Sequence, residues 1–220
     1  MKKLFAMAAM AWVATGAMAD WAGNQRYAEA NKTVAPGSVV LYGDSITDFW
    51  PNVRPQFFSE TKFVGRGISG QTTAQMLCRF RNDVINLKPK AVVILAGIND
   101  MAENIGPIKT EDAVGNLKSM CELAKANGIK VVLCSVTPAA NFPWRKQITD
   151  AVARIEEINR QLKAYADAQG ILWVEYNALL NDGKGGMGEN ATDGLHPNAK
   201  GYAIMEGALV PFLTKLGLMK

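Results

Sequence analysis

The stretch SVVLYGDSIT, residues 38–47, joins an apolar run to a Gly-Asp-Ser turn. Its residues from Val39 to Tyr42 are apolar at consecutive rather than alternate positions, which is typical of a strand covered on both faces, as in a parallel sheet. Ser45 follows where such a strand would end. Serine is also common in turns because its hydroxyl bonds nearby backbone groups, so this stretch alone leaves open whether Ser45 is a turn residue or a nucleophile.

The same kind of apolar run recurs along the chain, and longer helical patterns separate the runs. The further predicted strands lie at residues 63–64, 91–96, 129–134 and 171–174. The predicted helices lie at residues 72–87, 110–127, 148–168 and 198–216, with Thr110 as a cap and Gly128 as a stop. This alternation predicts an α/β fold, a three-layer αβα sandwich with a five-stranded parallel sheet. Ligands of such sheets bind at the carboxyl ends of the strands.

The first residues have the pattern of a secretory signal peptide. Lys2 and Lys3 precede an apolar run, and Ala17-Met18-Ala19 supplies a small-x-small cleavage pattern. The run is shorter than the ~20 apolar residues that a membrane anchor needs. We therefore expect export, to the periplasm or the exterior, after cleavage near Ala19. Residues 20–36 are expected to form an N-terminal arm, and residues 37–220 the one folded domain.

Composition narrows the possible partners. The net charge of the 220 residues is +4, and removal of the two lysines in residues 1–19 leaves +2, which gives no reason to expect nucleic acid as a partner. The three cysteines (Cys78, Cys121 and Cys134) each fall in a segment predicted to be buried, so we favour free, structural thiols over a disulfide of unknown pairing. No metal is expected, because neither CxxC nor His-rich spacing occurs. Nothing in the sequence favours one oligomeric state.

Several other polar residues follow predicted strands. His196, the one histidine, lies in TDGLHPNAKGY (192–202), where Asp193 could accept its Nδ1–H and leave Nε2 free as a base. The segments GRGISGQTT (65–73) and LAGIND (95–100) supply glycines and an asparagine amide, the groups that an oxyanion hole requires. Each pattern also has a purely structural interpretation: His196 could be a structural histidine, and the other two segments could be tight turns between a strand and a helix. Together they fall on one edge of the predicted sheet.

Four blocks in this order resemble the SGNH, or GDSL, hydrolase superfamily. They are GDSI (43–46), GISGQTT (67–73), GIND (97–100) and DGLHP (193–197), and the similarity runs from about residue 38 to the C-terminus. The resemblance implies a flavodoxin-like SGNH hydrolase fold for the domain at 37–220. It does not extend to the Gly-x-Ser-x-Gly elbow of α/β-hydrolases, because Thr47 stands two residues after Ser45.

The resemblance also implies roles for individual residues. Ser45 would be the nucleophile, His196 the general base and Asp193 the group that orients the imidazole. The oxyanion would be held by the backbone N–H of Ser45, the backbone N–H of Gly70 and the side-chain amide of Asn99. No cofactor and no metal are implied.

Four neighbouring residues are given structural roles. Asp44 and Asp100 are interpreted as loop-ordering carboxylates that accept backbone N–H bonds. Gly65 and Gly67 are interpreted as turn residues.

The expected substrate is a small-molecule or carbohydrate ester, with short O-acetyl groups favoured by the resemblance of GISGQTTAQML to the acetylhydrolase and carbohydrate-esterase branch. In the loop TPAANFPWR (137–145), Trp144 and Arg145 are candidate substrate-binding residues, although Trp144 could instead pack its own loop, and Trp50 is similarly ambiguous. Alternatives are a lysophospholipase or thioesterase of broad acyl specificity, an O-acyltransferase, and a non-catalytic carbohydrate-binding module.

Overall fold

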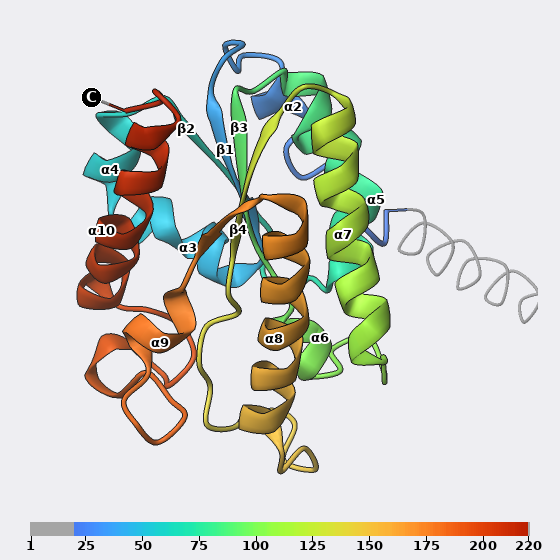
Figure 1. Ribbon diagram of the computed structural model, residues 1–220, viewed down its shortest axis with the longest axis vertical. Coiled ribbons are helices and arrows are strands. Elements are labelled where there is room, and N and C mark those ends of the chain that lie inside the picture. The colour runs from blue at the N-terminus through green and yellow to red at the C-terminus, as the bar shows by residue number, and fades with distance from the viewer. Residues whose placement is uncertain (1–19, 220) are drawn as a thin grey trace, which may run out of the picture.

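Five parallel strands form one sheet in the order β2-β1-β3-β4-β5 (Figure 1). The computed structural model describes residues 20–219, so the predicted signal peptide lies outside the described residues. The strands are β1 (Val39–Gly43), β2 (Phe63–Gly67), β3 (Ala91–Leu95), β4 (Lys130–Cys134) and β5 (Leu172–Val174). Each neighbouring pair is parallel. This strand order is the flavodoxin-like one, and the predicted α/β class is confirmed.

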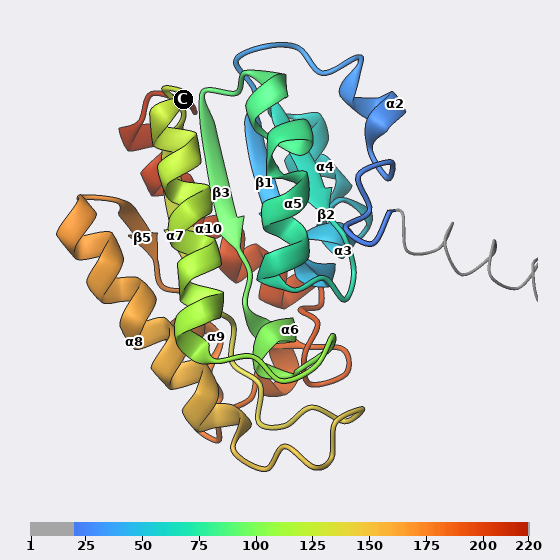
Figure 2. The same cartoon turned by 90° about the vertical axis from the view of Figure 1, so that its right-hand side faces the viewer.

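Helices cover both faces of this sheet (Figures 1 and 2). One face carries α3 (Ser45–Val53), α4 (Pro55–Ser59), α9 (Tyr176–Leu180) and α10 (Ala199–Lys215). The other carries α5 (Thr73–Asp83), α7 (Thr110–Ala126) and α8 (Ala151–Gln169). Shorter elements are α2 (Ala28–Asn31), α6 (Ile98–Met101) and two 3-10 turns, Ile85–Leu87 and Gly188–Asn190. The three predicted layers are present.

The core explains the consecutive apolar residues of the strands. Every residue of β1 and β3 is buried. Successive side chains of a strand point to opposite faces of the sheet, and helices cover both faces. Successive residues therefore enter different halves of the core. Tyr42 packs with Phe80 on the α5 and α7 side, while Leu41 packs with Trp50 and Leu209 on the α3 and α10 side.

Element boundaries differ from the sequence expectations by a few residues. The helix expected at 148–168 begins only at Ala151, and the one expected at 72–87 ends at Asp83 before a 3-10 turn. Thr110 lies inside α7 rather than capping it, because Lys109 holds the cap position. Gly128 has φ +69°, the left-handed conformation that ends a helix at low cost for glycine.

The three cysteines all lie in the described residues and are free, as expected. Cys121 and Cys134 are buried, but Cys78 is exposed, so the prediction of burial is wrong for that residue. The reason is helical periodicity: α5 turns Met76 and Phe80 toward the core, which directs Cys78 outward. Within residues 20–219, no helix has the length and apolarity needed to cross a bilayer.

Candidate active site

The carboxyl ends of three neighbouring strands lie side by side. Gly43 of β1 is in register with Gly67 of β2 and with Leu95 of β3. The residues that follow these ends therefore emerge at one edge of the sheet. Ser45 begins α3 directly after β1, and Asn99 lies in α6 directly after β3.

The turn that presents Ser45 depends on close backbone packing. Asp44 caps α3, and its Oδ1 accepts a 3.1 Å hydrogen bond from the Ile46 N–H. Gly67 lies in β2 against this turn, where an added Cβ would approach the Asp44 carbonyl oxygen at 2.6 Å and overlap the Asp48 nitrogen. Gly65 and Gly67 are thus strand residues, and the turn interpretation is wrong. Gly67 is needed because backbone atoms of α3 fill the space of a side chain.

A tight loop before α10 presents His196. Asp193 Oδ1 accepts hydrogen bonds from the backbone N–H groups of Leu195 (3.0 Å) and His196 (2.8 Å). The Thr192 N–H donates to the His196 carbonyl at 2.8 Å and closes the loop. Asn198 caps α10 directly afterwards, accepting from two N–H groups of its first turn. The side chain of His196 is therefore fixed by bonds local to the sequence.

The structure brings the three predicted residues Ser45, His196 and Asp193 together. His196 Nδ1 lies 2.7 Å from Asp193 Oδ2, and His196 Nε2 lies 2.9 Å from Ser45 Oγ. A carboxylate can only accept, so Nδ1 carries the proton and Nε2 presents its lone pair to the Ser45 hydroxyl. This arrangement can remove a proton from Ser45.

The charge of Asp193 suits this position. Partial burial alone would raise the pKa of the Asp193 carboxyl, but hydrogen bonds from the His196 side chain, the His196 N–H and the Leu195 N–H together outweigh that effect. Its pKa is therefore lowered. The carboxyl stays ionised and can stabilise an imidazolium on His196.

A contact between two helices joins the two parts of the site. The Tyr202 hydroxyl on α10 donates a 2.7 Å hydrogen bond to the Ile46 carbonyl on α3. The His196 ring also lies against Phe49 of α3, with 5.0 Å between ring centroids. The helix that follows the histidine loop is thus tied to the helix that carries Ser45.

Hydrogen-bond donors without protein acceptors gather beside Ser45. Within residues 20–219, neither the Ser45 N–H nor the Gly70 N–H donates to a protein atom. Gly70 has φ +77°, a left-handed conformation that favours glycine. Asn99 is buried and donates through Nδ2 to the Gln71 carbonyl at 3.0 Å, which leaves its second amide proton available. Such donors can receive the oxygen of a tetrahedral intermediate.

Two buried carboxyls support the loops around these donors, as expected. Asp100 accepts from the Thr73 N–H (2.9 Å) and the Thr73 hydroxyl (2.6 Å), which ties α6 to the start of α5. Burial, with a contribution from the nearby Asp100, raises the pKa of Asp44 to about 7, although the Ile46 N–H opposes the rise. Burial likewise raises the pKa of Asp100 to about 6.

An open groove of about 530 Å³ runs past Gly70. Its walls include Trp144 and Arg145 on one loop and Trp21 on the N-terminal arm. The Trp144 side chain is 46% exposed, although its indole N–H bonds Asn104. Trp50 lies elsewhere: it is buried and donates to Glu206, so it belongs to the core.

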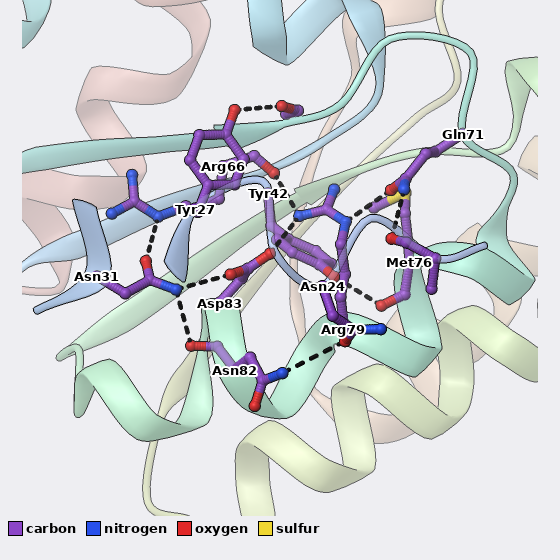
Figure 3. Close-up of polar contacts among 12 residues, drawn as sticks. Asn24, Tyr27, Asn31, Tyr42, Arg66, Gln71, Met76, Arg79, Asn82 and Asp83 are labelled. Carbon is purple, nitrogen blue, oxygen red and sulfur yellow. Dashed lines mark hydrogen bonds and ion pairs between the residues drawn. The ribbon is translucent and has the colours of Figure 1, made fainter. Parts of the chain in front are cut away.

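A buried arginine beneath the site was not found from the sequence. Arg79 donates to the Gly43 carbonyl (2.9 Å), the Arg66 carbonyl (3.0 Å), Gln71 Oε1 (2.6 Å) and Asp83 (2.9 Å) (Figure 3). It thus joins the ends of β1 and β2 to the loop that carries Gly70. The signal was an arginine and an aspartate four residues apart, beside the apolar positions of the helix predicted at 72–87.

The N-terminal arm packs against the same network. Gln71 Nε2 donates to the Ala22 carbonyl at 2.7 Å, and Tyr27 donates to the Gly67 carbonyl. Asn31 donates to Asp83 at 2.8 Å (Figure 3). Residues 20–31 therefore contact the loop after β2 from outside the sheet.

Among residues 20–219, no group of three or more His, Cys, Asp or Glu side chains could hold a metal ion.

The comparison with protein families decides the assignment. The sequence profile of the GDSL-like lipase/acylhydrolase family matches residues 41–204, about three quarters of the chain. The chain belongs to this family. It is therefore a carboxylic ester hydrolase, and the matched residues include Ser45, Gly70, Asn99, Asp193 and His196.

Individual relatives agree with the GDSL assignment. A solved GDSL-like lipase of Bacteroides thetaiotaomicron is 45% identical, with a TM-score of 0.85, over 88% of this chain and 98% of that one. The isoamyl acetate-hydrolyzing esterase of Saccharomyces cerevisiae is 24% identical over 78% of this chain and 83% of its own length. An acetylxylan esterase of Geobacillus stearothermophilus is 28% identical over 71% of this chain and 72% of its own length.

Proposed function

We propose that this GDSL hydrolase is a serine esterase that removes short acyl groups, above all O-acetyl groups, from carbohydrate. Ser45 is the nucleophile, His196 the general base and Asp193 the carboxylate that orients the imidazole. The observation that carries the proposal is the 2.9 Å contact between Ser45 Oγ and His196 Nε2, continued by the 2.7 Å contact to Asp193.

Acylation begins when Ser45 Oγ attacks the ester carbonyl carbon. His196 Nε2 takes the hydroxyl proton as the new C–O bond forms, because a neutral serine hydroxyl is a weak nucleophile. The carbonyl π electrons move to the oxygen. When the intermediate collapses, the alcohol leaves with the proton from the imidazolium. Water then repeats the sequence on the acyl-enzyme and releases the carboxylic acid.

The negative oxygen of each tetrahedral intermediate lies among the N–H groups of Ser45 and Gly70 and the amide of Asn99. These donors need no rearrangement during the reaction, since the Ser45 and Gly70 N–H groups have no competing protein acceptor within residues 20–219. One such donor is worth ~3–4 kcal/mol in the transition state.

The carbohydrate part of the proposal is supported by the groove beside Gly70. It combines the exposed indoles of Trp21 and Trp144 with polar groups from Arg145 and Gln75. Indole faces stack on the C–H faces of sugar rings, and polar groups bond the hydroxyls. Two of the relatives, the yeast esterase and the acetylxylan esterase, are named for acetate esters. A long acyl chain would favour a groove lined mainly by apolar side chains.

The catalytic proposal is tested by Ser45→Ala, with Ser59→Ala, an exposed serine on α4, as the control. We expect Ser45→Ala to lower kcat on p-nitrophenyl acetate by ~10⁴-fold or more, with unchanged circular dichroism and Ser59→Ala near wild type. Turnover by Ser45→Ala above one hundredth of the wild-type rate would overturn the mechanism.

The substrate proposal needs a separate comparison. The purified enzyme is assayed on acetylated xylan, acetylated sialic acid and p-nitrophenyl esters of increasing acyl length. We expect kcat/KM to fall from acetyl to octanoyl, and free acetate to be released from a sugar ester. A preference for octanoyl would favour the lysophospholipase or thioesterase alternative, and transfer of acetyl to an added sugar alcohol would favour the acyltransferase.

Export belongs to the same proposal, since an esterase for polymer-bound acetyl groups must meet its substrate outside the cytoplasm. The prediction is a mature chain that begins at Asp20, directly after the Ala17-Met18-Ala19 pattern. N-terminal sequencing of the protein from the extracellular or periplasmic fraction checks it, and a chain that still carries residues 1–19 there would contradict it.

A further inference from the structure

We propose that Asn104 is a positioning residue that orients the amide of Asn99 toward the oxyanion. The inference rests on the proposed oxyanion role of Asn99. Asn104 lies outside the four sequence blocks and contacts neither Ser45 nor His196 through a hydrogen bond. Its side chain lies between Asn99 and the substrate groove.

Three hydrogen bonds run in one direction through this side chain. The Trp144 indole N–H donates to Asn104 Oδ1 at 2.8 Å. Asn104 Nδ2 donates to Asn99 Oδ1 at 2.7 Å, and Asn99 Nδ2 donates to the Gln71 carbonyl at 3.0 Å. The chain of bonds thus begins at an exposed indole in the groove and ends at the loop that carries Gly70.

The groups at the two ends of this series of hydrogen bonds determine the orientation of both amide groups. An indole N–H can only donate and a backbone carbonyl can only accept. Asn99 must therefore turn its nitrogen to Gln71 and its oxygen to Asn104, and Asn104 must turn its oxygen to Trp144. A reversal of either amide would place two donors or two acceptors against each other at both of its contacts. In the observed orientation, the second proton of the Asn99 amide stays free.

Asn104 also supports the glycine of the oxyanion site. Its Nδ2 lies 3.2 Å from the Gly70 carbonyl, so one amide group contacts both Asn99 and Gly70. The Gly70 carbonyl belongs to the same residue as the N–H donor. Loss of the Asn104 amide would therefore loosen two of the three proposed oxyanion donors.

The backbone holds Asn104 in place independently of its side chain. Its N–H donates to the Asn99 carbonyl at 3.0 Å, and its carbonyl accepts from Arg145 Nη2 at 3.1 Å. The preceding residue, Glu103, adopts φ +53°, and its carboxylate pairs with Arg154 at 2.7 Å. A loop anchored in this way keeps residue 104 in position when its side chain is changed.

The first test is Asn104→Asp, which keeps the size of the side chain but replaces the donor by an acceptor. The carboxylate faces Asn99 Oδ1 and favours reversal of the Asn99 amide. On p-nitrophenyl acetate we expect kcat to fall by ~10- to 100-fold, less than for Asn99→Ala, with KM changed by less than about twofold. Asn127→Asp, the same change at an exposed site on the end of α7, is the control and should keep wild-type kcat.

The second test is Trp144→Phe, which removes the indole N–H and keeps an aromatic ring. We expect a several-fold fall in kcat, because Asn104 loses the partner that fixes its orientation. In the Asn99→Ala background, Asn104→Asp should lower kcat by a clearly smaller factor than in the wild-type background, since Asn99 is gone and only the contact with the Gly70 carbonyl remains to be lost.

The outcomes separate this inference from the proposed function. Wild-type kcat in Asn104→Asp, together with a large loss in Asn99→Ala, would overturn the inference and leave the esterase mechanism intact. An equal effect of Asn104→Asp in both backgrounds would also overturn it. Full activity of Asn99→Ala would instead remove the oxyanion role on which the inference rests. If Asn104→Asp does not fold, unchanged kcat in Trp144→Phe overturns the inference.

Discussion

The two halves of the site are built in different ways. The strand-edge half, with Ser45, Gly70 and Asn99, follows three strands whose ends are in register, and the buried Arg79 ties two of those ends to the glycine loop. The loop half, Asp193 and His196, belongs to no regular element, and the Asp193 side chain is 55% exposed.

The two halves differ in what holds their side chains in position. The strand-edge half takes its geometry from the sheet and from a charged network that water does not reach. The loop half takes it from one carboxylate that accepts two backbone N–H bonds and the imidazole Nδ1–H. A change to the supporting residue of each half should therefore have a different main effect: on activity for the Asp193 carboxylate of the loop half, and on the free energy of unfolding for the buried Arg79 of the strand-edge half.

Among changes to the supporting residues of the two halves, the largest effect is expected for Asp193→Asn. The amide can turn a donor toward Nδ1, which favours the wrong imidazole tautomer and should lower kcat by ~10³- to 10⁴-fold. Asp182→Asn is the control, because Asp182 also accepts the N–H groups of an exposed turn, at Lys184 and Gly186. Activity of Asp193→Asn within tenfold of wild type would mean that the loop half does not depend on its carboxylate.

In the strand-edge half, Arg79→Met should act on stability. The change leaves the buried Asp83 carboxylate without its counter-charge and removes one donor from each of three further acceptors, and we expect a loss of ~3–5 kcal/mol in the free energy of unfolding by urea. The i,i+3 ion pair of Arg160 and Glu157 is exposed, so Arg160→Met should leave the urea midpoint nearly unchanged. Similar midpoints for the two variants would contradict the role of the buried network.

Two glycines of the strand-edge half sharpen the contrast. Gly67→Ala places a Cβ against backbone atoms of α3, which should cost ~3 kcal/mol of stability. Gly70→Ala meets no atom within 4 Å, but φ +77° should cost ~1–2 kcal/mol and lower kcat. Urea unfolding and p-nitrophenyl acetate kinetics measure the two effects, and a more stable Gly67→Ala than Gly70→Ala would contradict the packing argument.

A further predicted effect is a pH dependence of stability at Asp44. Its pKa is about 7 in the folded chain and has an ordinary value of 3.8, so the folded state binds the proton more tightly. The contribution of this proton to the free energy of unfolding is complete below pH 3.8 and is lost as pH rises through 7. Asp44→Asn has no such loss, so relative to wild type it should gain ~3 kcal/mol between pH 5 and pH 8. A constant difference in unfolding free energy across that range would contradict the raised pKa.

The sequence predicted most of what the sheet determines. Consecutive apolar residues identified all five strands, because burial on both faces leaves little choice of side chain. Four of them agree within one residue at each end, whereas β2 extends three residues beyond the predicted 63–64. Ser45, Gly70 and Asn99 could be placed near one another because they follow strand ends. The predicted site residues stood out because each belongs to a short block with several constrained positions.

Contacts between side chains far apart in sequence could not be predicted in the same way. Asn104 has no neighbouring pattern, and its partners Trp144 and Asn99 lie 40 and 5 residues away. Arg79 resembled an ordinary helical arginine, since two of its four acceptors are backbone carbonyls, which carry no sequence signal. The exposure of Cys78 was missed because the segment was interpreted as buried throughout, without the helical phase.

The order of the catalytic groups along the chain has a consequence for synthesis and degradation. Ser45 and His196 are 151 residues apart, and α10, which follows the histidine, docks on α3 through the Tyr202 hydroxyl. A nascent polypeptide that ends before His196 contains all five strand segments but lacks the proposed base. On the proposed mechanism, ester hydrolysis therefore starts only when synthesis is nearly finished, and proteolytic removal of the last thirty residues, which include Asp193 and His196, would abolish it.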